Sequence, residues 1–406
     1  MRIVFLSHYF PPEVNAPAVR TFDHCVRWAA AGHDVHVITC TPSHPSGVPF
    51  PPYRKRWYQE EVVQGVHVHR VWTFLAANSG VALRVVNFLS FIPTSVWRAI
   101  RLGRADVIVA TSPQFFCAVA GCLAGALKRT PWVMEVRDLW PESIPEVGAM
   151  KESVVIRALK VVAKTLYQHA TAIVCLTNSF IDQIATMGIP RDKMVFVPNG
   201  IDPALWQSNL GPTERVEVGV SEDEVLVSYV GTLGMAHGLG TILDVASRLK
   251  REAPLVRFLI VGDGADRDAL LERIAGEQLS NVTMLGLVPR GRVPGLLAAS
   301  DILLVSLKAS PMFEKVLPSK LFEAMAAAKP VVLSVGGEAK AVLERAQAGI
   351  AVQPGNADAI AAAILELARD ADCRQRLGDA GRDYVQRFFT RDYWAAEMVR
   401  HLERLT

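Results

Sequence analysis

The hydrophobic pattern alternates between short runs rich in valine and isoleucine and longer segments with helical spacing. Continuous apolar strands that alternate with helices are typical of parallel sheets covered on both faces. The runs fall into two sets, which predict two doubly wound α/β domains rather than one large sheet or an eight-fold barrel. They lie at residues 3–6, 35–39, 66–71, 107–110, 132–136, 173–176 and 195–197, and then at 225–230, 258–261, 282–285, 302–305, 331–333 and 350–352.

A polar stretch separates the two sets of runs. Residues 203–223 contain Pro, Gly, Ser and Asn, and we expect a linker near residues 200–222. The predicted domains are residues 1–200 and residues 201–389, both Rossmann-like. Residues 390–406 contain an amphipathic helix that is expected to pack back on the first domain.

Composition narrows the class of protein. A chain of 406 residues, half of them hydrophobic and a fifth charged, fits two folded domains and argues against disorder. The net charge of +3 argues against a general nucleic-acid binder. The N-terminal run is expected to be a strand rather than a signal peptide, and no apolar run reaches the ~20 residues that a membrane-spanning helix needs.

The cysteines do not indicate a metal site. No CxxC pair or Cys/His cluster has metal-ligand spacing, so we expect small buried hydrophobes in a reducing cytoplasm. The six cysteines are Cys25, Cys40, Cys117, Cys122, Cys175 and Cys373.

Glycines follow two of the predicted strands of the second domain. Residues 230–240 include Gly231, Gly234, Gly238 and Gly240, and Gly262-Asp263-Gly264 follows the next strand. Glycine lets backbone N–H groups approach a phosphate that a Cβ would exclude, although glycine after a strand is also a routine turn. Ligands of parallel sheets collect at this carboxyl edge.

A second signal lies at a predicted helix start, where Pro318 and Ser319 precede Lys320 and Glu323. Lys320 and Glu323 are one turn apart on the same face. A lysine in the first turn opposes the helix dipole unless an anion lies nearby, and a diphosphate would remove that conflict. The other interpretation is an exposed Lys–Glu pair.

Five motifs carry a resemblance to a known family. Gly262-Asp263-Gly264, Pro198-Asn199-Gly200-Ile201-Asp202 and Phe322-Glu323-Ala324-Met325-Ala326 resemble glycosyltransferase family 4, whose members are retaining transferases of the GT-B fold, with two Rossmann-like domains facing each other across a cleft. Tyr9-Phe10-Pro11-Pro12-Glu13 and the segment 135–143 resemble a narrower branch, similar to the L-fucosamine transferases of O-antigen (lipopolysaccharide) and capsule clusters. That branch adds N-acetylated aminosugars in bacterial surface polysaccharide synthesis.

The resemblance implies a UDP-sugar donor, a lipid-linked saccharide acceptor and no metal or cofactor. It also implies the donor contacts. Glu323 would accept hydrogen bonds from the ribose hydroxyls, the N–H groups of Ser319, Lys320 and Leu321 would hold the diphosphate, Gly262 to Gly264 would close the pocket, and the backbone near Val288 would meet the base. Asn199 and Asp202 are expected to fix a turn.

The chain makes three departures from the family pattern. Lys315 stands where many members carry a glutamate, with Glu314 one place early; Thr232 and His237 stand where members carry Arg and Lys; and Asn15-Ala16 stands near a glycine pair. Another cation must therefore offset the charge of the leaving group, because electrostatic stabilisation is usually the largest catalytic term. Lys320 is the first candidate, followed by Lys315 and His237. An inactive paralogue is the alternative.

Candidates in the first domain follow its strands. Arg137 and Asp138 come after the run 132–136, where Arg137 can contact phosphate and Asp138 can orient a sugar hydroxyl; the alternative is a loop ion pair. Glu13 can position or deprotonate the acceptor, and helix N-capping is its alternative. In the retaining reaction, the acceptor hydroxyl attacks the face from which the diphosphate leaves and gives its proton to a phosphate oxygen.

Two stretches mix basic and aromatic residues, which is typical of an anionic bilayer interface. Residues 53–58 are expected to form a loop, and residues 81–104 a helical segment that includes Trp97, Arg98 and Arg101. Peripheral contact with the inner face of the bacterial inner membrane is the expectation, and a core helix with a solvated basic face is the alternative.

Three functions remain open from the sequence. The first is a nucleotide-sugar transferase, the second a nucleotide-sugar epimerase of the same fold, and the third a non-catalytic nucleotide-sugar-binding subunit of a polysaccharide assembly complex.

Overall fold

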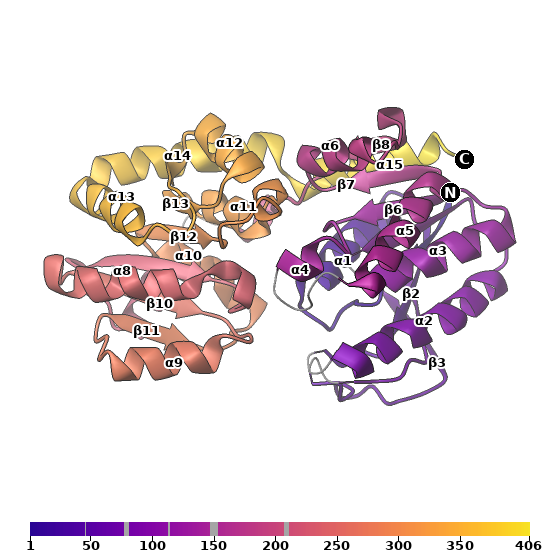
Figure 1. The fold of residues 1–406 in the computed structure, drawn as a ribbon, viewed down its shortest axis with the longest axis horizontal. Helices are drawn as coiled ribbons and strands as arrows, with labels where there is room; N and C mark the ends of the chain where they lie inside the picture. Colours follow the sequence, from indigo (N-terminus) through magenta and orange to yellow (C-terminus); the bar gives the residue numbers. More distant parts are fainter. Residues whose placement is uncertain (45, 77–80, 113, 147–152, 207–210) are drawn as a thin grey trace. The chain divides into compact units, whose positions relative to one another are not determined.

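The computed structural model describes residues 1–406 except 45, 77–80, 113, 147–152 and 207–210. The chain divides into two compact units (Figure 1). Unit 1 comprises Met1–Pro198 and Arg391–Thr406, and unit 2 comprises Asn199–Thr390. Each unit is a sheet covered by helices on both faces, as two sets of buried apolar strands require.

The sheet of unit 1 has eight strands among the described residues, all parallel except one at the edge. From β1 the chain winds outward in one direction through β2 and β4, and from β5 in the other, so the topological switch point lies between β1 and β5. In order across the sheet the strands are β3 (Tyr58–Val63), β4 (Val66–Val71), β2 (Asp34–Cys40), β1 (Arg2–Leu6), β5 (Val107–Ser112), β6 (Trp132–Val136), β7 (Ala172–Cys175) and β8 (Met194–Phe196).

The sequence did not predict β3, the antiparallel edge strand, and Tyr58 begins this strand instead of ending a loop. Its residues alternate between exposed and half-buried positions and include two adjacent glutamates. An edge strand of this kind lacks the continuous apolar run by which a central strand is recognised.

The helices of unit 1 cover both faces of its sheet. Helix α15 packs beside α1: Trp28 donates from Nε1 to the carbonyl of Ala395 at 2.9 Å, and Arg391 pairs with Asp23 at 2.7 Å. Helices α2 and α3 pack together, and α3 lies against β5 and β6. The helical elements are α1 (Ala16–Ala30), α2 (Val81–Arg101), α3 (Phe115–Lys128), α4 (Ser143–Glu146), α5 (Val154–His169), α6 (Asn178–Thr186), the 3₁₀ turn η1 (Arg191–Lys193) and α15 (Arg391–Glu403).

The sheet of unit 2 has six parallel strands within the described ranges. The chain winds from β9 outward through β10 and β11, and then from β12 the other way, so the switch point lies between β9 and β12. In order across the sheet the strands are β11 (Val282–Leu285), β10 (Val256–Val261), β9 (Val225–Val230), β12 (Ile302–Ser306), β13 (Val331–Ser334) and β14 (Gly349–Ala351).

Alternate residues of β9 serve the two faces of this sheet. Val227 and Tyr229 pack with α8 and α13, whereas Leu226 packs with Leu296 of α10. The helical elements of unit 2 are η2 (Pro203–Leu205), α7 (Pro212–Glu217), η3 (Met235–His237), α8 (Leu239–Glu252), α9 (Arg267–Gly276), η4 (Arg290–Arg292), α10 (Val293–Ala299), η5 (Phe313–Lys315), α11 (Ser319–Ala326), α12 (Gly337–Ala346), α13 (Ala357–Arg369) and α14 (Ala371–Phe388).

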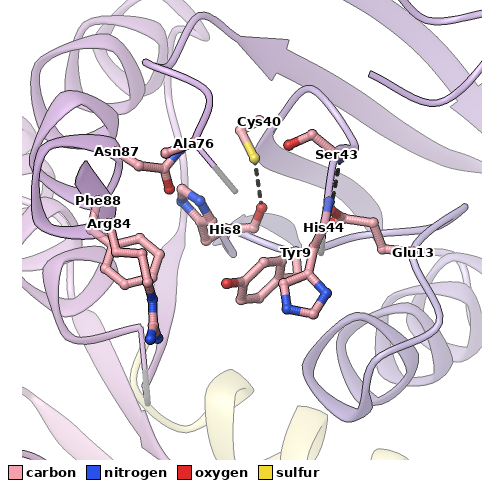
Figure 2. Close-up of a pocket in the computed structure, with 10 residues that line it drawn as sticks. All are labelled: His8, Tyr9, Glu13, Cys40, Ser43, His44, Ala76, Arg84, Asn87 and Phe88. Atoms are coloured by element: carbon pink, nitrogen blue, oxygen red, sulfur yellow. Dashed lines mark hydrogen bonds between the residues drawn. The ribbon is translucent and has the colours of Figure 1, made fainter. Parts of the chain in front are cut away.

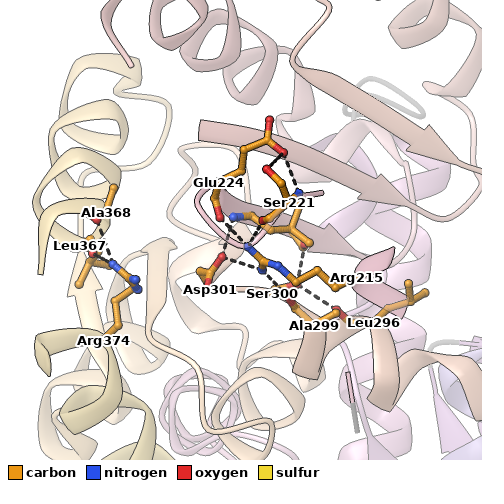
Figure 3. A network of polar contacts seen from close by, with 12 residues as sticks. Arg215, Ser221, Glu224, Leu296, Ala299, Ser300, Asp301, Leu367, Ala368 and Arg374 are labelled. Carbon is orange, nitrogen blue, oxygen red and sulfur yellow. Dashed lines mark hydrogen bonds and ion pairs between the residues drawn. The ribbon is translucent and has the colours of Figure 1, made fainter. Parts of the chain in front are cut away.

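A polar network fixes the amino-terminal ends of β9 and β12 (Figure 3). Arg215 donates to Asp301 at 2.9 Å and to the carbonyl of Ala299 at 3.0 Å, and Asp301 in turn accepts from the N–H of Leu226 at 2.8 Å. These hydrogen bonds hold the two central strands, β9 and β12, at the edge of the sheet opposite to the glycine turns. The carboxyl ends of the two strands take no part in this network.

Among the described residues, no helix is long and apolar enough to cross a bilayer.

Candidate functional site

The glycine turns of unit 2 lie at the carboxyl ends of β9 and β10 and support each other. The N–H of Gly231 donates to the carbonyl of Val261, and the N–H of Leu233 donates to the carbonyl of Asp263, both at 2.9 Å. A Cβ on Gly262 would lie 1.9 Å from the carbonyl oxygen of Gly231, and a Cβ on Gly264 would lie 2.3 Å from that of Leu233. Both positions also have positive φ, so only glycine allows the two turns to pack this closely.

Helix α11 begins at Ser319 without a side-chain cap. Residue 318 is a proline, and the N–H of Leu321 donates to its carbonyl at 3.0 Å. Three N–H groups were expected to hold a diphosphate. That of Leu321 already donates to a carbonyl within the chain. Those of Ser319 and Lys320 belong to the first turn of the helix, where N–H groups have no intrahelical acceptor. By contrast, Asn356 and Asp370 cap α13 and α14.

Lys320 reaches from α11 to the end of β9. Its Nζ donates to the hydroxyl of Tyr229 at 2.5 Å and lies 4.1 Å from the centroid of the Tyr229 ring. The residue is only partly exposed, and burial of the ammonium lowers its pKa to about 7, whereas nearby Glu323 raises it. Lys320 and Glu323 together line a hollow of about 230 Å³. They are therefore not a solvated surface pair.

His237 lies in η3 beside the same cluster, with its ring 6.2 Å from that of Tyr229. Burial, and secondarily the charge of Lys320, lower the pKa of His237 to about 4. In the ligand-free site His237 is therefore neutral near pH 7, and it can offer a hydrogen bond but no fixed charge.

The other expected donor residues lie at separate positions of unit 2. Gly234 precedes η3 and accepts from the N–H of His237 at 2.9 Å. Lys315 ends η5 and is half-buried, and Val288 is half-buried against the core cluster under α10. Asp202 caps η2 by accepting from the N–H of Ala204 at 3.1 Å, a structural role.

Arg137 and Asp138 follow β6 in unit 1, where they do not form an ion pair with each other, the alternative that the sequence left open. Arg137 donates to the carbonyl of Pro17 at 3.1 Å, and burial lowers its pKa to about 10, so it stays charged near pH 7. Asp138 accepts from the hydroxyl of Ser143 at 2.9 Å, and burial raises the pKa of its carboxyl.

Beside Arg137 lies a buried ion pair that the sequence did not predict. Arg20 of α1 meets Glu135 at 2.8 Å and donates to the carbonyls of Val197 and Pro198 at 2.8 and 2.7 Å. Arg20 thereby fixes the end of β8. A single arginine in an amphipathic helix gives no sequence signal for such a contact.

Glu13 does not cap α1, because Asn15 is the N-cap and accepts from the N–H of Ala18 at 3.0 Å. The Glu13 carboxylate instead accepts from the N–H groups of Ser43 at 3.0 Å and His44 at 2.9 Å. Burial raises its pKa. Glu13 therefore joins the loop after β1 to the loop after β2.

A pocket of about 340 Å³ opens beside Glu13, between the segments that follow β1 and β2 and helix α2 (Figure 2). Arg84, Asn87 and Phe88 of α2 line one side, and His44 the other. His8 lies between them, and burial lowers its pKa to about 4. In the described part of the chain, no group of three or more His, Cys, Asp or Glu side chains is placed to hold a metal ion.

The structure thus gathers Lys320, Glu323 and His237 at one edge of unit 2, together with Tyr229, which the sequence did not single out. Glu13, Arg137 and Asp138 lie at the carboxyl edge of the sheet of unit 1.

Solved structures share this fold. Sucrose-phosphate synthase from Thermosynechococcus elongatus matches with a TM-score of 0.78 at 17% identity, covering 99% of this chain and 98% of that one. HepE of Anabaena, in complex with UDP-glucose, matches with a TM-score of 0.75 at 18% identity, covering 99% of both chains. Both likenesses establish the GT-B fold, with its two Rossmann-like domains of parallel strands.

Relatives and family models agree with the fold. The "Putative colanic acid biosynthesis glycosyl transferase WcaI" of Escherichia coli (strain K12) is 26% identical over 95% of this chain and 96% of its own length. Residues 15–200 match the glycosyl transferase 4-like domain, and residues 212–384 match glycosyl transferases group 1. The chain therefore consists of these two domains in succession and belongs to the glycosyltransferases of the GT-B fold.

Proposed function

We propose that this chain transfers a sugar, in the first instance an N-acetylated aminosugar such as L-fucosamine, from a UDP-sugar to a lipid-linked saccharide during surface polysaccharide synthesis. Transfer retains the anomeric configuration and needs neither a metal nor a cofactor. The reaction takes place on the cytoplasmic face of the bacterial inner membrane.

The observation that carries this proposal is the carboxyl edge of the sheet of unit 2. There the uncapped first turn of α11, the ammonium of Lys320 and the two glycine turns gather beside the switch point between β9 and β12. N–H groups, a cation and glycine backbone are the features that bind a diphosphate. In this proposal Glu323, one turn after Lys320, accepts hydrogen bonds from the ribose.

The relatives support the choice of donor and product. HepE is described in complex with UDP-glucose, which favours a UDP-sugar as donor here. The name of WcaI refers to colanic acid biosynthesis, which favours a growing polysaccharide as acceptor.

The chemistry follows from the groups present. The acceptor oxygen forms a bond to the anomeric carbon while the bond from that carbon to the diphosphate breaks, and the hydroxyl proton passes to a phosphate oxygen of the leaving UDP. The N–H groups of Ser319 and Lys320 and the Lys320 ammonium stabilise the charge that develops on that leaving group. Asp138 orients a sugar hydroxyl, and Arg137 contacts phosphate.

For the acceptor we propose the pocket beside Glu13 in unit 1. Arg84 offers a cation, and His44 a ring nitrogen, to the acidic head of a lipid-linked saccharide. Glu13 holds the wall of this pocket through its two backbone contacts rather than acting as a free base.

A membrane-facing surface on unit 1 is consistent with a lipid-linked acceptor. One stripe of α2 exposes Val86, Leu89, Trp97 and Ile100, and the guanidinium of Arg101 lies 4.4 Å from the Trp97 ring. Apolar and aromatic side chains flanked by arginine suit the headgroup region of an anionic bilayer.

Arg98 has another role on this helix. It donates to His69 of β4 at 3.0 Å and lies 4.4 Å from the ring of Tyr58, so it fastens α2 to the sheet.

The proposal is tested by following UDP release from UDP-N-acetylaminosugars with and without a membrane extract that contains lipid-linked saccharides. Release that depends on the extract is expected, and the anomeric configuration of the product is read by NMR. Glu323→Ala should raise the donor KM at least tenfold, because a buried contact to the ribose is lost.

Sugar isomerisation without the extract would instead support the epimerase. UDP-sugar binding without turnover would support the non-catalytic subunit, and a normal donor KM in Glu323→Ala would place the ribose elsewhere.

A further inference from the structure

Tyr229 is a buried tyrosine whose hydroxyl emerges at the turn after β9. Its side chain has no exposed surface and packs in the core of unit 2. The hydroxyl donates to the carbonyl of Thr232 at 2.8 Å and accepts from Lys320 at 2.5 Å. Because its single proton is committed to Thr232, the lone pairs of the Tyr229 oxygen are directed to the lysine.

The turn itself makes room for the lysine. A Cβ on Gly231 would lie 2.9 Å from the Nζ of Lys320. The ammonium is thus held from two sides, by the ring and hydroxyl of Tyr229 and by the bare backbone of Gly231. A cation over a desolvated aromatic ring gains electrostatic attraction beyond its hydrogen bond.

We propose that Tyr229 is a positioning residue of the donor site, which holds the ammonium of Lys320 beneath the turn at Gly231 so that it meets the diphosphate of the nucleotide sugar. This inference rests on the proposed function. It also explains how this chain can keep a cation at the diphosphate although Thr232 and His237 stand at the two positions where the family carries Arg and Lys. The cation is Lys320 of α11, and Tyr229 of β9 holds it in place.

The charge state of this lysine links donor binding to protons. The titratable groups that face it are Tyr229 of β9, His237 of η3 and Glu323 of its own helix. Burial raises the pKa of Tyr229, and His237 is neutral near pH 7, so Lys320 is the group that titrates there. With a pKa of about 7 in the free protein, Lys320 should take up a proton when the diphosphate binds.

A double-mutant cycle tests the proposal on the full chain with UDP as the probe. Tyr229→Phe keeps the ring and removes the hydroxyl, and Lys320→Met removes the ammonium. Titration calorimetry gives the Kd of UDP for the unmodified protein, the two single variants and the double variant. Repetition in two buffers of different ionisation enthalpy gives the number of protons taken up.

We expect Tyr229→Phe to weaken UDP binding roughly tenfold, as loss of a hydrogen bond to a charged group does. In the Lys320→Met background the same change should alter Kd less than about twofold, because a residue that acts through Lys320 has nothing left to position. Proton uptake near pH 8 should be seen in the unmodified protein and absent from Lys320→Met.

An equal loss in both backgrounds would overturn the inference, since Tyr229 would then act through the Thr232 turn alone. Failure of the unmodified protein to bind UDP would overturn the proposed function as well. If Tyr229→Phe does not fold, Tyr229→Met takes its place in the cycle, and Tyr167→Phe, a change in another buried tyrosine within unit 1, serves as control.

Discussion

At the scale of single residues, the ammonium of Lys320 is the group whose burial carries the clearest energetic consequence. It lies against the ring of Tyr229, and Glu323 on the same helix is an ionic neighbour. Burying a cation away from water costs free energy unless its partners replace the lost hydration. The free-energy cost of burying the ammonium lowers the stability of the free protein. A bound diphosphate would offset this cost, because its charge would pair with the ammonium.

Lys320→Met should therefore stabilise the ligand-free protein while it weakens UDP binding. Burial lowers the pKa of Lys320 to about 7, below the pKa of a lysine in the unfolded chain. Between these two pKa values the unfolded chain binds more protons than the folded chain, so the free energy of unfolding rises with pH. The free-energy cost of burying the ammonium is therefore largest at or below pH 7 and shrinks as pH rises. We expect the melting temperature to rise at pH 6 by about 3 °C. The gain at pH 9 should be smaller.

Thermal melts of both proteins at the two pH values provide the measurement. Equal melting temperatures at pH 6 would mean that water solvates the ammonium.

At the scale of elements, the glycine turns and the strands they follow were recognisable from the sequence, and the edge strand β3 was not. Continuous apolar runs such as residues 258–261 of β10 identify a strand because both of its faces are buried. Strand β3 exposes every second residue and carries Glu60 and Glu61, which help to hold Arg98 and Arg70. These ion pairs join residues that lie on different elements, so they produce no periodic pattern from which a strand could be predicted.

The close packing of the two turns leads to a prediction for Gly262. Its φ is +143°, and a Cβ would lie 1.9 Å from the Gly231 carbonyl oxygen, so Gly262→Ala must push the turns apart. We expect a loss of about 2–4 kcal/mol in the free energy of unfolding of unit 2 and a loss of UDP binding.

Denaturant unfolding with and without UDP measures both effects. Gly276→Ala at the end of α9 is the matched control, because a Cβ there meets nothing within 4 Å. Unchanged stability in Gly262→Ala would show that the turns yield at little cost.

At the scale of the whole chain, the sequence could indicate both domains and the start of α11 but not the partner of Lys320. Tyr229 and Lys320 are 91 residues apart, and only the pairing of β9 with β12 and the path of α11 bring them together. Tyr229 itself occupies an inward position of a central strand, where an aromatic residue is ordinary core. Likewise, the sequence of residues 16–30 does not predict that Arg20 donates hydrogen bonds to the carbonyls after β8.

The proposed membrane surface lies on α2 of unit 1, and its test must leave intact the contacts that hold α2 in place. Arg98 is fastened to His69 and Tyr58, so its replacement would disturb the fold. Arg101 and Arg104 are exposed, and the double change to Glu should remove about 1 kcal/mol of attraction per arginine to anionic lipid and add repulsion. Sedimentation with phosphatidylglycerol vesicles should therefore recover at least tenfold less of this variant than of the unmodified protein, with UDP binding unchanged.

The same change at Arg345 and Arg369, exposed on α12 and α13 of unit 2, controls for net charge. If both double variants lose vesicle binding equally, the attraction is nonspecific. If neither does, α2 does not face the membrane, and the proposed acceptor pocket beside Arg84 must receive its substrate from solution.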